Sequence, residues 1–150
     1  MERPSKDQYY INIAMAVSKR STCLKRHYGA VIVVDDRIVG TGYNGSPSGH
    51  YNCCDLGICR RPTAEKGKDY FECPAVHAER NAIIQATKHD GCSVFGATLY
   101  LACEDVEHVD GVPAWDLIDA KPCMYCEEMI KMHGIARVVN GRNVLNGTDQ

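Results

Sequence analysis

Two short segments, far apart in the chain, restrict the fold more than any other feature of this sequence: His77-Ala78-Glu79 and Pro122-Cys123-Met124-Tyr125-Cys126. One imidazole and two thiols are the nitrogen and sulfur donors that zinc prefers. Because His77, Cys123 and Cys126 can bind one ion only where they meet, the fold has to bring the two segments together. Three protein ligands leave the fourth tetrahedral position open to water, as in catalytic rather than structural zinc sites.

Each of these segments is expected to open a helix. Pro74 and Pro122 stand shortly before the ligands, and proline is common at helix starts. Cys123 and Cys126 are three residues apart, so they would share one face of a first helical turn. Two helix N-termini directed at one metal would stabilise thiolate and hydroxide through their positive dipole ends. Glu79 is then a carboxylate beside the metal but outside the ligand set, able to transfer protons.

The composition restricts the class of protein. A chain of 150 residues, 45% of them hydrophobic, is long enough for a single domain over residues 1–150 with its own core. The formal net charge of −2 leaves no electrostatic footprint for a long polyanion, so a polynucleotide partner is not expected. No apolar run reaches the ~18 residues of a membrane span, and the first ten residues lack a signal-peptide core, so no membrane partner is expected. Nine cysteines without an export signal indicate a reducing compartment, the cytoplasm, with thiolates held by metal.

Hydrophobic periodicity predicts an α/β fold. The expected elements, in order, are a helix over residues 6–20, a hairpin of strands 28–34 and 37–43, a helix over 75–88, a strand over 97–103, a helix over 123–133 and a strand over 135–139. Ala78, Ala82 and Ala86 form a small-residue face that lets the second helix pack closely on a sheet. This order predicts three α/β/α layers, with an N-terminal hairpin, a mixed sheet of four to five strands and helices on both faces. Both zinc-binding helix starts are expected at one edge of the sheet.

Three segments lie outside these elements. The loop over residues 50–74 is long for a compact domain and crowded with thiols, so it is expected to be tied down by a second, structural zinc. Residues 104–120 form an acidic excursion with six Asp and Glu residues and no Lys or Arg. Residues 141–150 form a short polar tail that is expected to fray.

The acidic excursion joins a strand to the ligand-bearing helix, so it is expected beside the active-site edge of the sheet. Its acids would repel a bare phosphate. They have to turn away, be bridged by Mg²⁺, or be compensated by basic residues, for which the candidates are Arg60, Arg61, Lys66 and Lys68. The simpler alternative is that these acids belong to a solvated loop.

The sequence resembles the zinc-dependent cytidine/deoxycytidylate deaminase superfamily, and within it the dCMP deaminases most of all. His-x-Glu followed by Pro-Cys-x-x-Cys is the signature of zinc nucleobase deaminases. The resemblance extends over residues 8–140 through GAVIV (29–33), GTGYNGSP (40–47), AVHAERNAII (75–84) and residues 97–100. It implies that His77, Cys123 and Cys126 bind the catalytic zinc and that Glu79 shuttles protons. The implied reaction is the hydrolysis of dCMP to dUMP and ammonia.

The resemblance also implies partners. Asn44 is similar to the family asparagine that contacts the nucleoside. Tyr43, Asn44 and Gly45 lie in a glycine-rich stretch similar to the one that binds dCTP or dTTP in regulated members, and Mg²⁺ would accompany a triphosphate effector. Regulated members are homohexamers, so a homo-oligomer is expected.

A second zinc site is likewise implied, because related deaminases bind a second zinc through similarly placed cysteines. The cysteines that resemble its ligands are Cys23, Cys53, Cys59 and Cys73, with Cys54 or His50 as substitutes. Cys92 and Cys103 are better explained as small buried hydrophobic residues.

Two alternatives stay open. The first is the same chemistry on another base, namely cytosine, guanine, cytidine or adenosine in tRNA; the net charge disfavours tRNA, and the GYNGSP loop favours a deoxynucleotide. The second is a non-catalytic zinc module in which both metals are structural. Glu79 disfavours this module, because a structural site has no need of a carboxylate beside an open metal position.

Overall fold

The computed structural model describes residues 1–61, 72–89, 91–109, 112–117 and 120–141, with the backbone alone for residues 89, 106–109 and 112–117. The elements are, in order, α1 (Lys6–Ser18), β1 (Arg26–Val34), β2 (Arg37–Tyr43), α2 (Cys53–Leu56), α3 (Ala78–His89), β3 (Thr98–Val109), β4 (Val112–Leu117), α4 (Met124–Met132) and β5 (Arg137–Asn140).

The strands form one five-stranded mixed sheet in which β2, β1, β3 and β4 are consecutive neighbours and β5 pairs with β3. β1 is antiparallel to both β2 and β3, with Ala30 opposite Gly42 on one side and Leu101 on the other. β5 runs parallel to the first part of β3, over residues 98–101. β4 runs antiparallel to the second part, from Glu104 onward. β5 and β4 therefore pair with successive parts of the long strand β3, on the side away from β1.

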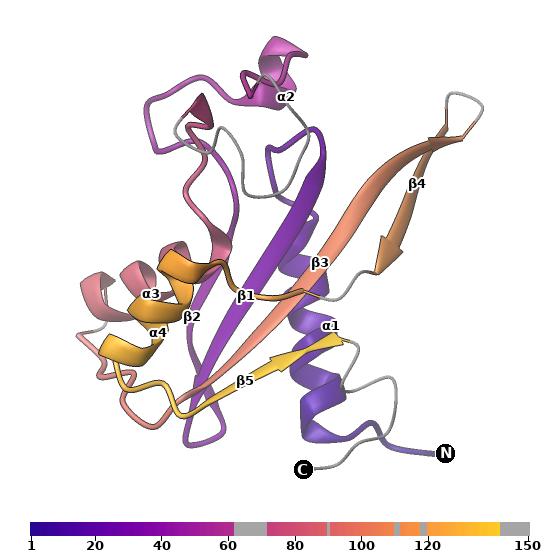
Figure 1. Cartoon of the computed structure of the whole chain (residues 1–150). Coiled ribbons are helices and arrows are strands. Elements are labelled where there is room, and N and C mark those ends of the chain that lie inside the picture. The colour runs from indigo at the N-terminus through magenta and orange to yellow at the C-terminus, as the bar shows by residue number, and fades with distance from the viewer. Residues whose placement is uncertain (62–71, 90, 110–111, 118–119, 142–150) are drawn as a thin grey trace.

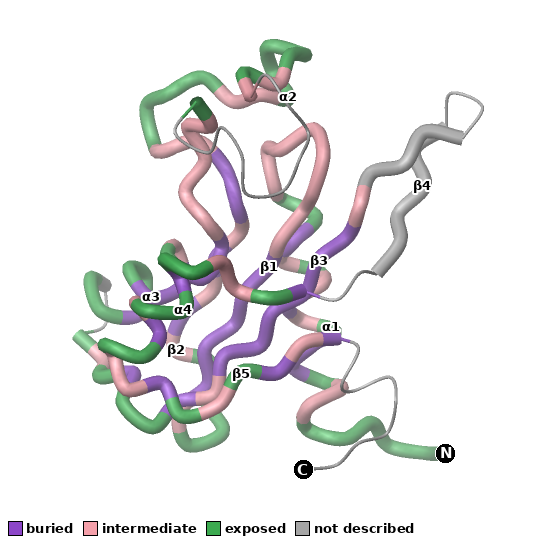
Figure 2. The backbone as a smooth tube through the Cα atoms, viewed as in Figure 1, coloured by how far each residue is buried: buried purple, intermediate pink, exposed green. Residues whose placement is uncertain are grey.

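Helices cover both faces of this sheet (Figure 1). On one face, α1 packs Tyr10, Ile11 and Ala14 against a cluster that includes Tyr100 and Ala102 of β3. On the other face, α3 and α4 cover the alternate residues of β3, Leu99, Leu101 and Cys103. Burial is concentrated along β1 and β3, between the helical layers (Figure 2). The predicted three-layer α/β/α arrangement is confirmed.

The contact between α3 and the hairpin is close because two glycines face the helix. Ala78, Ala82 and Ala86 are all fully buried, as their spacing predicts. A Cβ added at Gly42 would lie 2.4 Å from the carbonyl oxygen of Ala78, and one at Gly40 would lie 2.4 Å from that of Ala82. The helix backbone thus lies directly on the strand, which fixes the height of its first turn above the sheet.

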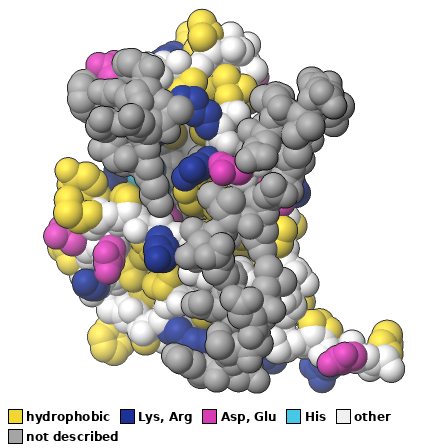
Figure 3. Space-filling model, turned by 45° about the vertical axis from the view of Figure 1, so that its right-hand side comes forward, with side chains coloured by type: hydrophobic (Ala, Val, Ile, Leu, Met, Phe, Trp, Pro, Cys, Tyr) yellow, Lys and Arg dark blue, Asp and Glu magenta, His cyan; other side chains and the backbone are white. Residues whose placement is uncertain are grey.

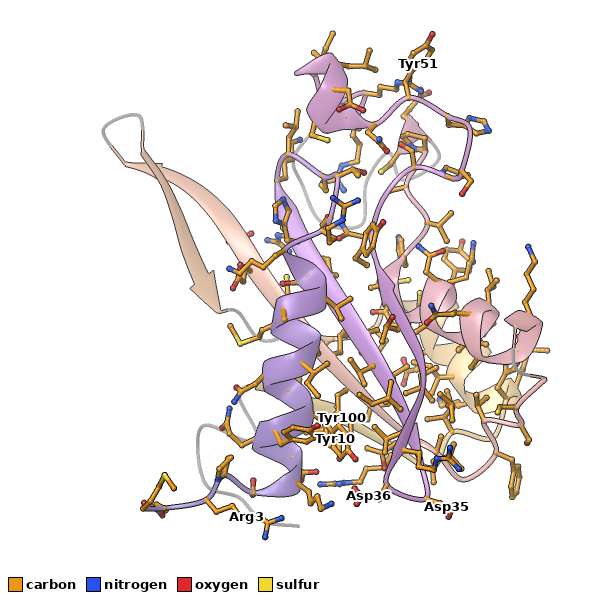
Figure 4. The ribbon with its side chains drawn as sticks, turned by 180° about the vertical axis from the view of Figure 1, so that it is seen from behind. Arg3, Tyr10, Asp35, Asp36, Tyr51 and Tyr100 are labelled. Carbon is orange, nitrogen blue, oxygen red and sulfur yellow. The ribbon has the colours of Figure 1, made fainter. Side chains whose placement is uncertain are left out.

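The N-terminal half of α1 is hydrogen-bonded to the sheet through polar side chains (Figure 4). The Tyr10 hydroxyl donates to Asp36 Oδ1 at 2.6 Å, across the β1–β2 turn, whose residues Asp35 and Asp36 both have positive φ. Positive φ at both central positions is typical of the tightest hairpin turns. The Tyr10 ring also lies 5.1 Å from that of Tyr100, measured between centroids.

Two predicted boundaries differ from the structure. The helix predicted over residues 75–88 is α3, and it starts at Ala78 rather than at residue 75. Val76 and Gly45 exchange two backbone hydrogen bonds in an isolated antiparallel bridge, which keeps the residues before His77 extended.

The acidic excursion is the larger difference, because its first residues continue β3 to Val109 and residues 112–117 form β4. The sequence holds a hairpin signal that the acidic composition obscures: Asp110-Gly111 stands between two short stretches that carry β-forming residues, Val106 and Val109 before it and Val112 and Trp115 after it. In Figure 1 this β3–β4 hairpin extends away from the helices.

The loop over residues 50–74 contains the short helix α2, and its residues 62–71, with Lys66 and Lys68, lie outside the described residues. So do residues 142–150 of the expected tail. On the face shown in Figure 3, the described Lys and Arg side chains are interspersed with Asp and Glu rather than gathered into one basic surface. In the described residues, the search for a helix of sufficient length and hydropathy to cross a membrane found none.

Candidate active site

Both predicted ligand segments lie at helix starts. His77 directly precedes α3, and Glu79 belongs to the first turn of that helix. Cys123 is the N-cap of α4, where its Sγ accepts the backbone N–H of Cys126 at 3.5 Å. A thiolate fits this position, because an N-cap acceptor satisfies a helix N–H and the positive end of the helix dipole stabilises an anion.

The three candidate donors converge. His77 Nδ1 lies 3.4 Å from Cys123 Sγ and 3.3 Å from Cys126 Sγ. Zinc bonds of about 2.3 Å to sulfur and 2.0–2.1 Å to nitrogen, at tetrahedral angles, require nitrogen–sulfur separations of about 3.6 Å. Within the described part of the chain, the one set of three or more His, Cys, Asp or Glu donor atoms all within 4.8 Å of one another is that of His77, Cys123 and Cys126. The residues present therefore fit a zinc ion.

Glu79 is buried beside this set, with 4% of its surface exposed. Burial raises the pKa of the Cys126 thiol, and the Glu79 carboxylate and Cys123 raise it further. A thiol held neutral in this way becomes a ligand when a metal ion displaces its proton. The site therefore combines a cation-binding donor set with a buried carboxylate that is not part of it.

Asn44, the predicted nucleoside contact, follows β2 and is buried. Its side-chain Oδ1 accepts the backbone N–H of Tyr28 at 2.8 Å, and its Nδ2 donates to the carbonyl oxygen of Arg26 at 3.0 Å. The Ser21 hydroxyl donates to the same Oδ1 at 2.6 Å. The side chain thus joins the end of β2 to the beginning of β1.

Asn81 lies in the AVHAERNAII stretch of the resemblance, in which the motifs assign a role to His77 and Glu79 alone. Its Nδ2 donates to the carbonyl oxygen of Tyr43 at 2.9 Å, and a weaker contact of 3.5 Å joins it to that of Val76. It therefore connects the residue before Asn44 to the residue before His77. Its position four residues after His77, within a helix face of alanines, is the only signal in the sequence.

The neighbouring Gly45, predicted with Tyr43 and Asn44 to contact an effector, has both its N–H and its C=O bonded to Val76. A Cβ at this position would lie 2.7 Å from Thr22 Oγ1. Both backbone hydrogen-bonding groups of Gly45 are thus used within the fold. Contacts of Tyr43, Asn44 and Gly45 with a nucleotide stay predictions.

The structure brings the four cysteines predicted for a second zinc to one pocket. The residues lining it include Cys23, Cys53, Cys59, Cys73, Arg60 and Arg61. Burial raises the pKa of the Cys53 thiol, and the other three cysteines raise it further. The two substitute ligands, Cys54 and His50, are both exposed. The four thiols share a pocket without reaching the mutual spacing of the His77 set.

Two acids of the excursion form ion pairs with bases that the sequence did not indicate, Lys19 and Arg26. Glu104 is buried, and Lys19 Nζ donates to its Oε1 at 2.7 Å. Arg26 Nε donates to Asp105 Oδ1 at 2.8 Å. The β1–β3 register places these two acids beside the end of α1 and the start of β1, where Lys19 and Arg26 reach them. Compensation of the excursion by Arg60 or Arg61 stays a prediction. The side chains of Glu107 and Asp116, and all of Asp110 and Asp119, lie outside the described residues.

The sequence matches a protein family over residues 4–142, and that family is described as "Cytidine and deoxycytidylate deaminase zinc-binding region". The deoxycytidylate deaminase of Mycobacterium phage D29 is 36% identical over 143 residues, covering 93% of this chain and 96% of the relative. That of Schizosaccharomyces pombe is 36% identical over 138 residues, covering 91% of this chain but only 37% of the relative.

Among solved structures, the dCMP deaminase from cyanophage S-TIM5 in apo form is similar, with a TM-score of 0.63 and 26% identity over 93% of this chain and 84% of that chain. The same cyanophage enzyme in complex with dCMP and dUMP has a TM-score of 0.65 at 24% identity, over 97% and 91% of the two chains, and shares the fold.

Proposed function

Because the chain belongs to the cytidine and deoxycytidylate deaminase zinc-binding family, we propose that it hydrolyses dCMP to dUMP and ammonia at the site of His77, Glu79, Cys123 and Cys126. The observation that carries this proposal is the convergence of three zinc donors beside a buried carboxylate. The similarity to the phage D29 deoxycytidylate deaminase over nearly the whole of both chains supports dCMP as the substrate.

His77, Cys123 and Cys126 would hold the zinc. The chemistry that zinc supplies in such a site is Lewis acidity, which lets water lose a proton near neutral pH. Glu79 is the group that moves protons: it accepts one from the attacking water and donates it to N3 of cytosine, then accepts the proton of the resulting C4 hydroxyl and donates it to the departing amine. Its burial keeps it out of bulk solvent, so the proton it carries stays within the site. The water supplies the oxygen at C4, and the amino group leaves as ammonia.

Ammonia release from a panel of dCMP, deoxycytidine, CMP, cytosine and guanine tests this proposal. We expect the highest kcat/KM for dCMP, and loss of turnover in Glu79→Gln. A faster reaction with guanine or a free base would assign the same chemistry to another substrate. A zinc-loaded chain that releases no ammonia from any of them would instead be a zinc module without catalysis.

A second, structural zinc is proposed for the pocket of Cys23, Cys53, Cys59 and Cys73. Metal analysis of the active protein should find two zinc ions per chain, and Cys59→Ser should lower this to one while the ion at His77 stays. Cys92→Ser is the matched control, since Cys92 is also half-buried but follows the far end of α3. One zinc per active wild-type chain would contradict the second site.

Regulation by dCTP and dTTP, with Mg²⁺, through Tyr43, Asn44 and Gly45, and assembly into a homohexamer, complete the proposal. Six chains of 16.6 kDa give a particle of about 100 kDa, which light scattering can measure. Turnover of dCMP with each triphosphate, with and without Mg²⁺, tests the effectors. Since Glu104 and Asp105 are occupied by Lys19 and Arg26, neutralising these two acids should leave the Mg²⁺ response unchanged.

A further inference from the structure

The orientation of the Asn44 amide is set by the backbone of β1. The N–H of Tyr28 can only donate, so it requires Oδ1, and the carbonyl of Arg26 can only accept, so it requires Nδ2. Turning the amide over would break both bonds. The side chain therefore has one orientation, which needs no assumption about its nitrogen and oxygen positions.

The Ser21 hydroxyl completes this arrangement. Ser21 Oγ lies 2.6 Å from Asn44 Oδ1 and 2.9 Å from the Asn44 carbonyl oxygen, and it accepts the backbone N–H of Cys23 at 3.3 Å. Among the described residues, Ser21 provides the one side-chain hydrogen bond to the Asn44 amide, since the other two come from backbone. With Tyr28 and Ser21 on Oδ1 and Arg26 on Nδ2, the amide retains one N–H for a further partner.

We propose that Ser21 is a positioning residue for nucleotide binding. Its hydroxyl holds the buried Asn44 side chain so that the remaining N–H is presented to an acceptor oxygen of the nucleotide. This inference rests on the proposed function, in which Asn44 contacts the nucleotide. Ser21 stands in the connection between α1 and β1, far in the sequence from His77, Glu79, Cys123 and Cys126, and it acts through Asn44 without touching the reacting atoms.

The test is steady-state deamination of dCMP by Ser21→Ala. One neutral hydrogen bond that preorganises a binding contact is worth about a three- to tenfold change in affinity. We expect KM to rise by that factor while kcat stays within about twofold of wild type and the number of zinc ions per chain is unchanged, because the lost contact serves binding and not proton transfer.

A double-mutant cycle separates positioning from structure. If Ser21 acts through Asn44, adding Ser21→Ala to Asn44→Ala should leave KM unchanged, because the group it positions is gone. Equal KM increases in both backgrounds would overturn the proposal. A lower melting temperature with an unchanged KM would also overturn it, by assigning Ser21 a structural role.

Ser93→Ala is the matched control. Ser93 Oγ likewise accepts the N–H two residues ahead, from Phe95, at 3.2 Å, but it follows the far end of α3. Ser21→Thr and Ser21→Val extend the test should Ser21→Ala fail to fold, because they have the same shape and only the first keeps a hydroxyl; equal KM values for this pair would contradict the proposal. A wild-type chain that does not deaminate dCMP would instead refute the proposed function.

Discussion

His77, Cys123 and Cys126 are well placed for metal binding because each stands at or beside a helix N-terminus, where backbone N–H groups point outward. The Cys126 N–H, for example, already donates to Cys123 Sγ. Donor positions are thus set by two backbone turns and not by long flexible side chains. Little reorganisation is then needed when the ion binds.

Glu79 and His77 should give different results when they are substituted. Glu79→Gln should lower kcat for dCMP by about 10²–10⁴-fold with the zinc retained, because it removes a proton carrier and leaves the donor set intact. His77→Ala should lose the zinc of this site together with the activity. Metal analysis beside steady-state kinetics distinguishes the two results, with Glu128→Gln on the exposed side of α4 as the control. Near wild-type turnover in Glu79→Gln would refute the assigned role.

The ligand set could be predicted from sequence because the residues of His-x-Glu, and those of Cys-x-x-Cys, are only two or three positions apart. Residues this close in the chain stay close in the folded protein. The roles of Ser21 and Asn81 could not be predicted, because their partners, the Asn44 side chain and the Tyr43 carbonyl, are remote from them in the sequence. No residue pattern encodes which carbonyl a side-chain amide will reach. Such supporting contacts become visible only when the strands are in register.

At the scale of elements, the first turn of α3 is positioned by its direct contact with β2. Gly42→Ala would place a Cβ 2.4 Å from the Ala78 carbonyl oxygen and 2.5 Å from the Ala82 nitrogen, so the helix has to move away. We expect the free energy of unfolding to fall by about 3 kcal/mol, together with reduced kcat, because Glu79 moves with the helix.

Denaturant unfolding and dCMP kinetics of Gly42→Ala measure both effects. Gly91→Ala is the control, since Gly91 has a positive φ but nothing within 4 Å of an added Cβ. It should lose only about 1 kcal/mol through backbone strain, with kcat unchanged. Equal behaviour of the two variants would contradict the close-contact explanation.

The hydrogen bond between Tyr10 of α1 and Asp36 of the β1–β2 turn should contribute less to stability at high pH. The hydrogen bond to Asp36 raises the pKa of Tyr10 to about 12, and burial adds to this effect. The stability that neutral Tyr10 contributes is therefore complete below its unfolded pKa of about 10, and is lost as the pH rises towards 12. Wild type should exceed Tyr10→Phe in melting temperature at pH 8, and the difference should shrink above pH 10. A difference that stays constant across this range would contradict the bond.

The order of the elements was predictable because helix and strand periodicities are clear in the core-forming segments. The end of β3 was not, since in residues 104–120 a single Asp-Gly turn dipeptide is the hairpin signal, within an acidic composition that favours a loop. The start of α3 was misplaced by three residues because the Gly45–Val76 bridge, a tertiary contact, overrides the local helix signal. Misplaced boundaries in this chain thus lie where long-range backbone pairing decides.

At the scale of the whole molecule, Asp7 joins the first helix to the last strand. Its carboxylate accepts a pair of bonds from the Arg137 guanidinium and one from the Tyr100 hydroxyl at 2.7 Å. The bonds from Arg137 hold the pKa of Asp7 below its usual value, against the opposing effect of burial. This contribution to stability is present at neutral pH and is lost as the pH falls through the folded pKa of Asp7.

A metal ion shared by the starts of α3 and α4 would act as a cross-link. It closes a loop of about fifty residues, and an unfolded chain has to give up several kcal/mol of chain entropy to keep such distant donors together. The ion therefore binds the folded chain far better than the unfolded one, and the population of folded molecules becomes a function of free zinc.

In buffered zinc above the dissociation constant, the free energy of unfolding should rise by about 1.4 kcal/mol for each tenfold increase in free zinc per site. His77→Ala should lower that slope by the amount of one site, and an unchanged slope would show that the unfolded chain holds the metal equally well. Cells that limit zinc would then control the lifetime of this chain as well as its catalysis.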